Sequence, residues 1–314
     1  MKGLELAERF YTTCRPRLMQ AMPRVMARAA AGLAGEGSEC FGLDDEISQD
    51  HDFGAAFCLW LPKALLEAQR ETIEAAFRTL PESFEGFGSR LPPDARAGRV
   101  GPVAREDFCR AFFGIPRPPG TWREWLAIPE YQLAAFSNGK VFEDGDGAFT
   151  ALRAAVLDFY PNDVLLKKIA ARAMQTAQAG QYNLPRSLAR GDAIAAMLAC
   201  ARFAESAMSL VFLMNRRYMP FYKHAGRLLP QLPVLGKELA ALLKDLAARP
   251  LRGGQDLDAA QAVEDFCGLV ARRLVASGMS DVRRTWLWLH GPSIARKITD
   301  DELRATDLLK DILP

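Results

Sequence analysis

Five carboxylates fall within nine residues of the chain, directly before an apolar run. They are Asp44, Asp45, Glu46, Asp50 and Asp52. If Asp50 leads into a strand over Phe53 to Leu61, Asp52 shares its face, because strand side chains alternate with a period of two. Two unpaired carboxylates on one buried face repel each other, and a divalent cation removes that cost. The spacing therefore predicts a metal site at Asp50 and Asp52, with Mg²⁺ completing its shell from phosphate oxygens and water.

Glycines and a serine precede this acidic stretch. Gly35, Gly37 and Gly42 loosen the backbone and allow close approach to a ligand. Gly37-Ser38, twelve residues before Asp50, offers backbone N–H groups and a hydroxyl to phosphate oxygens.

The alternative for this stretch is an acidic, glycine-containing surface turn. Loop carboxylates are usually only solvated, and we favour that reading for Asp44, Asp45 and Glu46. For Asp50 and Asp52 we favour the metal.

The order of these features resembles a known superfamily. Hydrophobic residues, Gly37-Ser38, a spacer, Ser-x-Asp-x-Asp and then an apolar strand are similar to the nucleotidyltransferase fold of polymerase-beta-like and aminoglycoside-modifying enzymes. The fuller string GSECFGLDDEISQDHDFG resembles an uncharacterised bacterial subfamily of it. The resemblance implies that Gly37 and Ser38 hold the triphosphate of an NTP. It also implies that Asp50 and Asp52 bind Mg²⁺ or Mn²⁺, and that these two and Ser38 are the catalytic residues.

The superfamily usually has a third carboxylate on a later strand, and this chain departs from that pattern. The candidate strand Arg99–Val103 has no acid, and Glu106 and Asp107 follow it in the first turn of a predicted helix, where acids are favoured by the helix dipole. Asp144, after Glu143 at the end of a predicted last strand, is a possible third metal ligand if that strand lies beside Phe53–Leu61. The alternative is a polar strand end closed by a Gly-rich turn.

Length and pattern predict two domains and an α+β fold. We expect a small mixed sheet with helices over residues 1–155 and an all-helical bundle over 156–314, because every segment from Ala148 onward has helical periodicity. In more detail, the pattern predicts two N-terminal helices separated near Pro16, a helix over Lys63–Leu80, and exposed tryptophans at 122 and 125.

Composition limits the partners and the compartment. A net charge of +2 argues against a nucleic-acid partner, which needs an excess of Lys and Arg on one face. Six cysteines without metal-ligand spacing predict reduced, mostly buried thiols in a cytoplasmic protein. The start of the chain has acids where a signal peptide has an apolar core. The apolar run 193–214 contains Arg202 and Glu205, which favours a core helix over a membrane span.

Two polar segments interrupt the predicted helices, and we call them the first and second polar segments. They are residues 180–192 and residues 215–224. One interpretation is that they line a nucleotide or acceptor site; the other is that they cap helix–helix corners. The residues proposed for binding are Tyr182, Asn183, Arg186, Asn215, Tyr222 and Lys223.

These observations leave two functions open. The first is a metal-dependent enzyme that transfers a nucleoside monophosphate from an NTP to the hydroxyl of a small-molecule or protein acceptor. The second is a nucleotide or metabolite sensor that keeps the pocket but lacks the third carboxylate. The acceptor, the base and the oligomeric state do not follow from the sequence.

Overall fold

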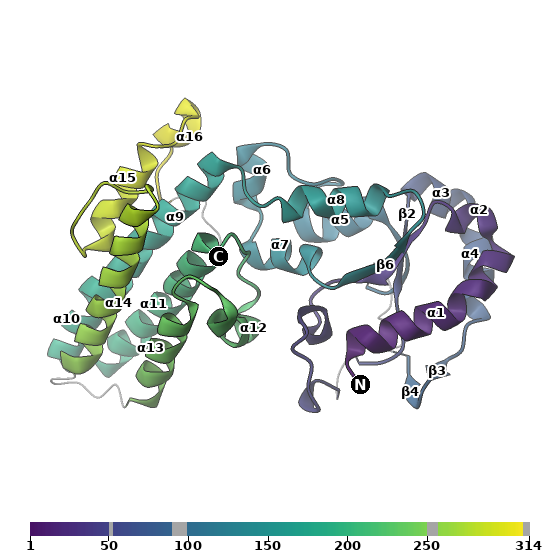
Figure 1. Cartoon of the computed structure of the whole chain (residues 1–314), viewed down its shortest axis with the longest axis horizontal. Helices are drawn as coiled ribbons and strands as arrows, with labels where there is room; N and C mark the ends of the chain where they lie inside the picture. Colours follow the sequence, from purple (N-terminus) through teal and green to yellow (C-terminus); the bar gives the residue numbers. More distant parts are fainter. Residues whose placement is uncertain (50–52, 90–98, 250–256, 310–314) are drawn as a thin grey trace. The chain divides into compact units, whose positions relative to one another are not determined.

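The structure is a computed structural model that describes residues 1–49, 53–89, 99–249 and 257–309. The fold is α+β, as predicted, with strands in the first half of the chain and only helices in the described chain after Asp144 (Figure 1). The chain divides into two compact units, Met1–Pro119 with Gln132–Asp158 and Gly120–Tyr131 with Phe159–Pro314.

The segment Gly120–Tyr131 groups with the helical unit, whereas the sequence analysis had placed it in the first domain. Side-chain contacts explain this grouping. The Trp125 ring lies edge-on to Tyr160 at 5.4 Å, and Glu130 forms an ion pair with Lys168. Trp125 is buried, so the prediction that it is exposed was wrong.

The first unit combines helices with two sheets. Its elements are α1 (Gly3–Ala21), α2 (Pro23–Met26), β1 (Ala30–Leu33), β2 (Cys58–Leu61), α3 (Lys63–Ala68), α4 (Arg70–Arg78), β3 (Ser83–Phe84), β4 (Phe87–Gly88), β5 (Gly101–Ala104), α5 (Arg105–Phe113), α7 (Glu130–Ser137), β6 (Lys140–Asp144) and α8 (Ala148–Leu157). The first two residues of α7, Glu130 and Tyr131, belong to the second unit.

The main sheet has the order β5-β2-β1-β6 and is mixed. β2 and β6 run antiparallel to β1, and β5 runs parallel to β2. We call the side where β1 ends and the other three strands begin the loop edge. It is formed by Leu33, Cys58, Gly101 and Lys140. The opposite side, where β1 begins and the other three strands end, is the far edge.

β1 is the central strand, and all four of its residues are buried. Gly32 lies in it at a register shift between β1 and β6, where a Cβ would overlap the carbonyl oxygen of Lys140 and crowd the Trp60 ring. A side chain at this position therefore has no room, which is why a glycine occurs inside a short buried strand.

Helix α1 runs unbroken through Pro16, so the predicted break there was wrong. A proline inside a helix removes one hydrogen bond and costs about 3 kcal/mol. The helix nevertheless buries Leu6, Phe10, Cys14 and Leu18 along one face. Each buried large apolar side chain contributes about 1.5–3 kcal/mol, so the packed face outweighs the lost bond.

Two other predicted elements are shorter than expected. The strand predicted over Phe53–Leu61 is regular only at β2, with Ala55 forming an isolated bridge to Ser89. The helix predicted over Lys63–Leu80 is interrupted at Gln69, whose φ of −115° separates α3 from α4.

The second unit is helical throughout its described residues. Its elements are α6 (Trp122–Ala127), α9 (Asn162–Thr176), a π-helical segment (Ala177–Asn183), α10 (Leu184–Ala189), α11 (Ala193–Met214), α12 (Tyr222–Leu228), α13 (Gly236–Ala248), α14 (Leu257–Ala276), α15 (His290–Ala295) and α16 (Asp301–Ala305).

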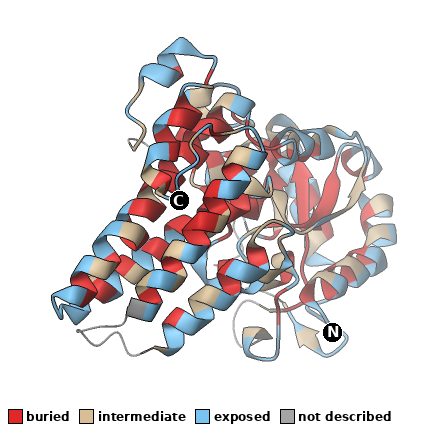
Figure 2. Cartoon of the chain, turned by 60° about the vertical axis from the view of Figure 1, so that its left-hand side comes forward, coloured by how far each residue is buried: buried red, intermediate tan, exposed pale blue. Residues whose placement is uncertain are grey.

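Buried residues follow the inner faces of these helices and the strands of the sheet (Figure 2). By length and composition alone α11 is apolar enough to cross a membrane, but 56% of its apolar window is buried within the protein. None of the six cysteines, all of which the structure describes, forms a disulfide, and five of them are buried, as predicted.

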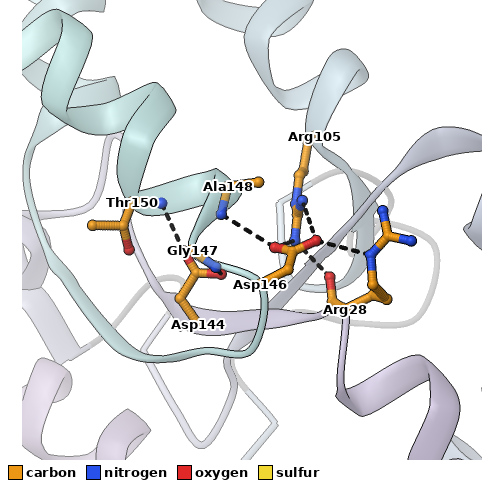
Figure 3. A network of polar contacts seen from close by, with 7 residues as sticks. All are labelled: Arg28, Arg105, Asp144, Asp146, Gly147, Ala148 and Thr150. Carbon is orange, nitrogen blue, oxygen red and sulfur yellow. Dashed lines mark hydrogen bonds and ion pairs between the residues drawn. The ribbon is translucent and has the colours of Figure 1, made fainter.

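A charged network holds the far edge of the sheet together (Figure 3). Asp146 accepts hydrogen bonds from Arg105 at 2.7 and 3.1 Å, from Arg28 at 3.0 Å and from the amide of Ala148 at 3.2 Å. Arg105 also donates to the carbonyl of Arg28 at 2.5 Å. The network therefore connects the chain before β1, the start of α5 and the turn after β6.

This network predicts a stability change in acid. Burial raises the pKa of Asp146, but hydrogen bonds from Arg105, Arg28 and Ala148 outweigh it and hold the pKa at about 2, below the ordinary 3.8. A depressed pKa contributes stability that is present above the ordinary pKa and is lost as the pH falls towards 2. We expect this contribution, about 2 kcal/mol, to disappear between about pH 4 and 2, and to be absent in Asp146→Asn. Urea unfolding between pH 5 and 2 measures it. Glu46→Gln, at an exposed carboxylate, is the control; the same pH dependence in wild type and Asp146→Asn contradicts the prediction.

Candidate functional site

The chain leaves β1 at the loop edge and forms the loop Gly35–Ser38, which is tied to the turn before β6. The Asn138 amide donates to the Gly35 carbonyl at 2.7 Å, and its oxygen accepts from the Gly35 amide at 3.0 Å. The amide of Gly139 donates to the carbonyl of Cys40 at 2.9 Å. Gly139 has φ +64°, and a Cβ there would overlap the Leu33 carbonyl, so the Asn-Gly pair is required by geometry.

A buried arginine fixes the position of Asn138. Arg153, from α8, donates to the carbonyl of Ser137 at 2.9 Å, at the end of α7. It is 8% exposed, and burial lowers its pKa. The loop thus rests on a chain of contacts from Arg153 through Ser137 and Asn138 to Gly35.

The loop presents hydrogen-bond donors that the described protein does not use. The amides of Gly37 and Ser38 and the hydroxyl of Ser38 have no hydrogen-bond partner among the described residues. Both residues are half-buried, at the start of the 3-10 helix Ser38–Phe41. The carboxylate of Glu39 folds back against Gly37, where a Cβ would overlap it. The arrangement offers two N–H groups and one hydroxyl beside a buried carboxylate.

The five acids between Ser38 and β2 that the sequence singled out are described only in part. Asp50 and Asp52, the predicted metal ligands, lie outside the described residues, so their metal role stays a prediction. Asp44 is 4% exposed, not solvated as predicted; it accepts from the amide of Gly3 at 2.8 Å and pairs with Lys2 at 3.5 Å, which fixes the start of α1. Asp45 and Glu46 are exposed, as predicted.

Asp144, the possible third metal ligand, lies at the far edge. It pairs with Ala30 at the start of β1, whereas Ser38 comes five residues after the end of β1. Its carboxylate accepts from the amides of Gly147 at 3.1 Å and Thr150 at 2.7 Å, at the start of α8 (Figure 3). The register therefore separates Asp144 from the Gly37-Ser38 loop, and we no longer assign it to the metal site.

The other acids at the end of β6 and after β5 are engaged in structural contacts. Glu143 accepts from Tyr11 at 2.7 Å and from Arg15 at 2.8 Å. Burial and this carboxylate raise the pKa of Tyr11. Near the end of β5, Glu106 accepts from the amide of Lys63 at 3.0 Å, and Asp107 pairs with the Lys63 ammonium at 3.1 Å. These acids hold the far side of the sheet.

In the first polar segment, Tyr182 and Arg186 form a stacked pair. The guanidinium of Arg186 lies 4.7 Å from the centroid of the Tyr182 ring, and Tyr182 is 48% exposed. Asn183 is exposed and lines a pocket together with Arg202.

In the second polar segment, Asn215 has a structural role. Its amide donates to the carbonyls of Val211 at 2.7 Å and Val234 at 2.9 Å, and its oxygen accepts from the amide of Val234 at 2.9 Å. These contacts satisfy most of its bonding capacity, which favours the corner-capping interpretation over cofactor binding. Tyr222 and Lys223 are exposed at the start of α12.

Helix α11 separates the two segments. Asn183 lies beside Arg202, and Asn215 comes thirteen residues after Arg202 along the chain. At 1.5 Å per residue this is about 20 Å. Tyr182, Asn183 and Arg186 therefore do not form one site with Asn215, Tyr222 and Lys223.

The sequence analysis missed a buried charge cluster in the helical unit. Glu130 is fully buried and pairs with Lys168 at 3.5 Å and Arg172 at 3.4 Å, while Ser209 donates to it at 2.9 Å. Burial lowers the pKa of Lys168 to about 8, against the opposing effect of Glu130. The signal was available in α9, where Lys168 and Arg172 share one face of a helix whose other residues are mostly apolar.

Comparison with known proteins gives one match. Residues 125–225 match the model of a domain of unknown function, DUF4037. No curated protein and no solved structure matches the chain. The matched stretch contains the buried charge cluster and both polar segments.

The buried cluster predicts an asymmetry between two glutamates. Glu130→Gln leaves two buried cations without their carboxylate, and breaking such a group typically costs about 3–5 kcal/mol. Glu302→Gln removes an exposed carboxylate that pairs with exposed Arg123, a contact typically worth about 0–1 kcal/mol. Chemical denaturation of both variants measures the difference. Equal losses would show that the cluster contributes no more than a surface pair.

Proposed function

We propose that the protein is a metal-dependent nucleotidyltransferase that moves a nucleoside monophosphate from an NTP to an acceptor hydroxyl. The observation that carries this proposal is the Gly37-Ser38 loop with its three available donors at the loop edge of the sheet. The antiparallel strand β2 begins at that same edge, and Asp50 and Asp52 precede it in sequence.

The charge around the loop supports a requirement for a divalent cation. The carboxylate of Glu39 lies against Gly37, and Glu36 is the preceding acid. A triphosphate bound at the loop faces these negative charges, so its binding there is unfavourable without a cation between them. Asp50 and Asp52 are the residues that we propose to hold Mg²⁺ or Mn²⁺.

In this proposal the metal and the Gly37-Ser38 loop have separate roles in binding the triphosphate. The metal, when bound, neutralises charge on the reacting and leaving phosphates. The amides of Gly37 and Ser38 and the Ser38 hydroxyl orient the triphosphate, and the Asn138 contacts hold the loop in place. Transfer forms a bond between the acceptor oxygen and the α-phosphorus and breaks the bond to pyrophosphate, and the acceptor proton passes to a base.

A specific observation favours the second candidate, a nucleotide or metabolite sensor. Among the described residues, the acids after β5 and those at and after the end of β6 lie towards the far edge, where protein groups bind Glu106, Asp107, Glu143, Asp144 and Asp146. None of these acids is placed to act as the third carboxylate at the Gly37-Ser38 loop. Release of pyrophosphate from an NTP separates the enzyme from the sensor.

The remaining proposals concern partners and compartment. The near balance of charge supports a small molecule or protein rather than nucleic acid as the acceptor. Six unpaired cysteines support a cytoplasmic location.

Metal dependence is tested by calorimetry with a non-hydrolysable NTP. We expect binding in Mg²⁺ or Mn²⁺ that is lost in Asp50→Asn/Asp52→Asn, because the variant no longer neutralises the phosphates through the metal. Unchanged circular dichroism confirms that the variant folds. Equal NTP affinity of wild type and variant would assign these carboxylates to a solvated turn.

The Ser38 hydroxyl is tested by two measurements on one variant. One hydrogen bond to a charged group is worth about 1.5–3 kcal/mol, so Ser38→Ala should weaken NTP affinity by roughly ten- to a hundredfold. Its melting temperature should not change, because this hydroxyl has no hydrogen-bond partner among the described residues.

Asn138→Ala is the matched comparison, because it removes two bonds to Gly35 and should lower both affinity and stability. A lower melting temperature with unchanged affinity in Ser38→Ala would refute the phosphate role of the hydroxyl.

A further inference from the structure

A pocket of about 340 Å³ lies within the helical unit, between α9, the π-helical segment and α11. Its polar lining comes mainly from Arg172, Gln175, Gln178, Asn183, Arg202 and Glu205. Arg172 is 4% exposed, whereas Gln178, Asn183, Arg202 and Glu205 are exposed. The pocket thus has a buried guanidinium at its base and polar residues around its opening.

The guanidinium of Arg172 is held rigidly and still has donors to offer. It donates to Ser209 at 2.8 Å, to Gln175 at 2.5 Å and to Glu130 at 3.4 Å. An arginine has five N–H groups, so two remain without an acceptor among the described residues. A fixed guanidinium with two such N–H groups is preorganised to bind a planar or tetrahedral anion.

The charges around the pocket favour an anion. Of the charged residues that line the pocket, Arg172 and Arg202 are positive and Glu205 is negative. The lining therefore carries one positive charge in excess. A buried excess charge is costly, and a bound anion would offset that cost.

The backbone shape keeps the pocket open. The π-helical segment Ala177–Asn183 widens one turn after α9, and π-turns occur frequently at functional sites. Gly180 lies so close to α11 that a Cβ there would overlap the Phe203 ring. This close approach fixes the π-helical segment against α11 and sets the width of the pocket beside Asn183.

We propose that this pocket binds a small metabolite with a carboxylate or phosphate group, held by Arg172 at the base and Arg202 at the opening. The amides of Gln175, Gln178 and Asn183 offer both donors and acceptors to the uncharged polar part of the molecule. The volume is at the low end for ligand pockets, which fits a compact metabolite. This site is distinct from the Gly37-Ser38 loop and does not depend on the nucleotidyltransferase proposal.

The test measures thermal unfolding of the full chain in potassium phosphate and potassium acetate against potassium chloride at equal ionic strength, without divalent metal. An anion that binds only the folded protein raises the melting temperature. We expect phosphate or acetate to do so in wild type, and the anion with the larger effect identifies the preferred group. In Arg202→Gln its affinity should fall about ten- to a hundredfold, as for one lost bond to a charged group.

Three variants distinguish this pocket from other sites. Arg190→Gln removes another exposed arginine, which does not line the pocket, and this variant should behave like wild type. Ser38→Ala should also keep the anion effect, because it alters only the loop of the other unit. Arg172→Lys keeps the charge but loses the planar fork, and it should abolish the effect while retaining the fold.

Three results would overturn the proposal. The first is stabilisation in chloride equal to that in phosphate and acetate. The second is the same loss of affinity in Arg190→Gln and Arg202→Gln, which indicates general screening. The third is loss of the stabilisation by the anion in Ser38→Ala, which would show that the anion binds at the Gly37-Ser38 loop. If Arg172→Lys does not fold, the comparison of anion affinity between Arg202→Gln and Arg190→Gln still tests the proposal.

Discussion

The register of β1 against its neighbours is the constraint on which the first unit depends. β1 has only four residues, all buried, and it pairs antiparallel with both β2 and β6. This pairing brings the end of β1 and the starts of β2, β5 and β6 to one side of the sheet. A shift of one residue would exchange the side chains on the two buried faces of β1 and separate Gly35 from Asn138. The position of the donors at Gly37 and Ser38 therefore follows from strand pairing.

The same register explains why two groups of acids near one sheet have different roles. Acids that follow β5 and β6 emerge at the far edge, where Arg28, Arg105, Lys63 and helix-start amides bind them. The described acids between β1 and β2 lie in the segment that leaves β1 at the loop edge. Among them Asp44 fixes the start of α1, while Glu39 lies against Gly37. The Gly37-Ser38 loop is thus separated from the charge network that stabilises the far edge of the sheet.

Elements with a clear local pattern were predictable from the sequence. The first strand, β5, β6 and the helices α8, α9, α11, α13 and α14 follow from apolar runs, periodicity and turn residues, and the structure confirms them. The helix predicted over residues 281–290 was wrong, because α15 begins only at His290. The continuity of α1 through Pro16 was not predictable, because it depends on burial against the rest of the unit. The burial of Asp44 depends on the amide of Gly3, forty-one residues earlier. Neither effect leaves a signal in the local sequence.

In the candidate site, too, some features follow from the local sequence and others only from the three-dimensional structure. The Gly-Ser motif and its distance from Asp50 and Asp52 are local signals, and the loop was found from them. The two polar segments looked alike in sequence, but only a three-dimensional structure shows that α11 separates Asn183 from Asn215. The cluster around Glu130 combines α7, α9 and α11, so the partner of Lys168 and Arg172 was not apparent from α9 alone.

The two proposed anion sites have opposite electrostatic character. The Gly37-Ser38 loop has Glu36 and Glu39 beside it, and we propose that phosphate binds there together with a cation. The lining of the helical pocket has one positive charge in excess and needs no cation. Divalent metal should therefore govern occupancy of the first site and leave the second unchanged. Because the compensating charge is supplied by a metal in one unit and by the protein in the other, chelation distinguishes which unit holds a bound anion.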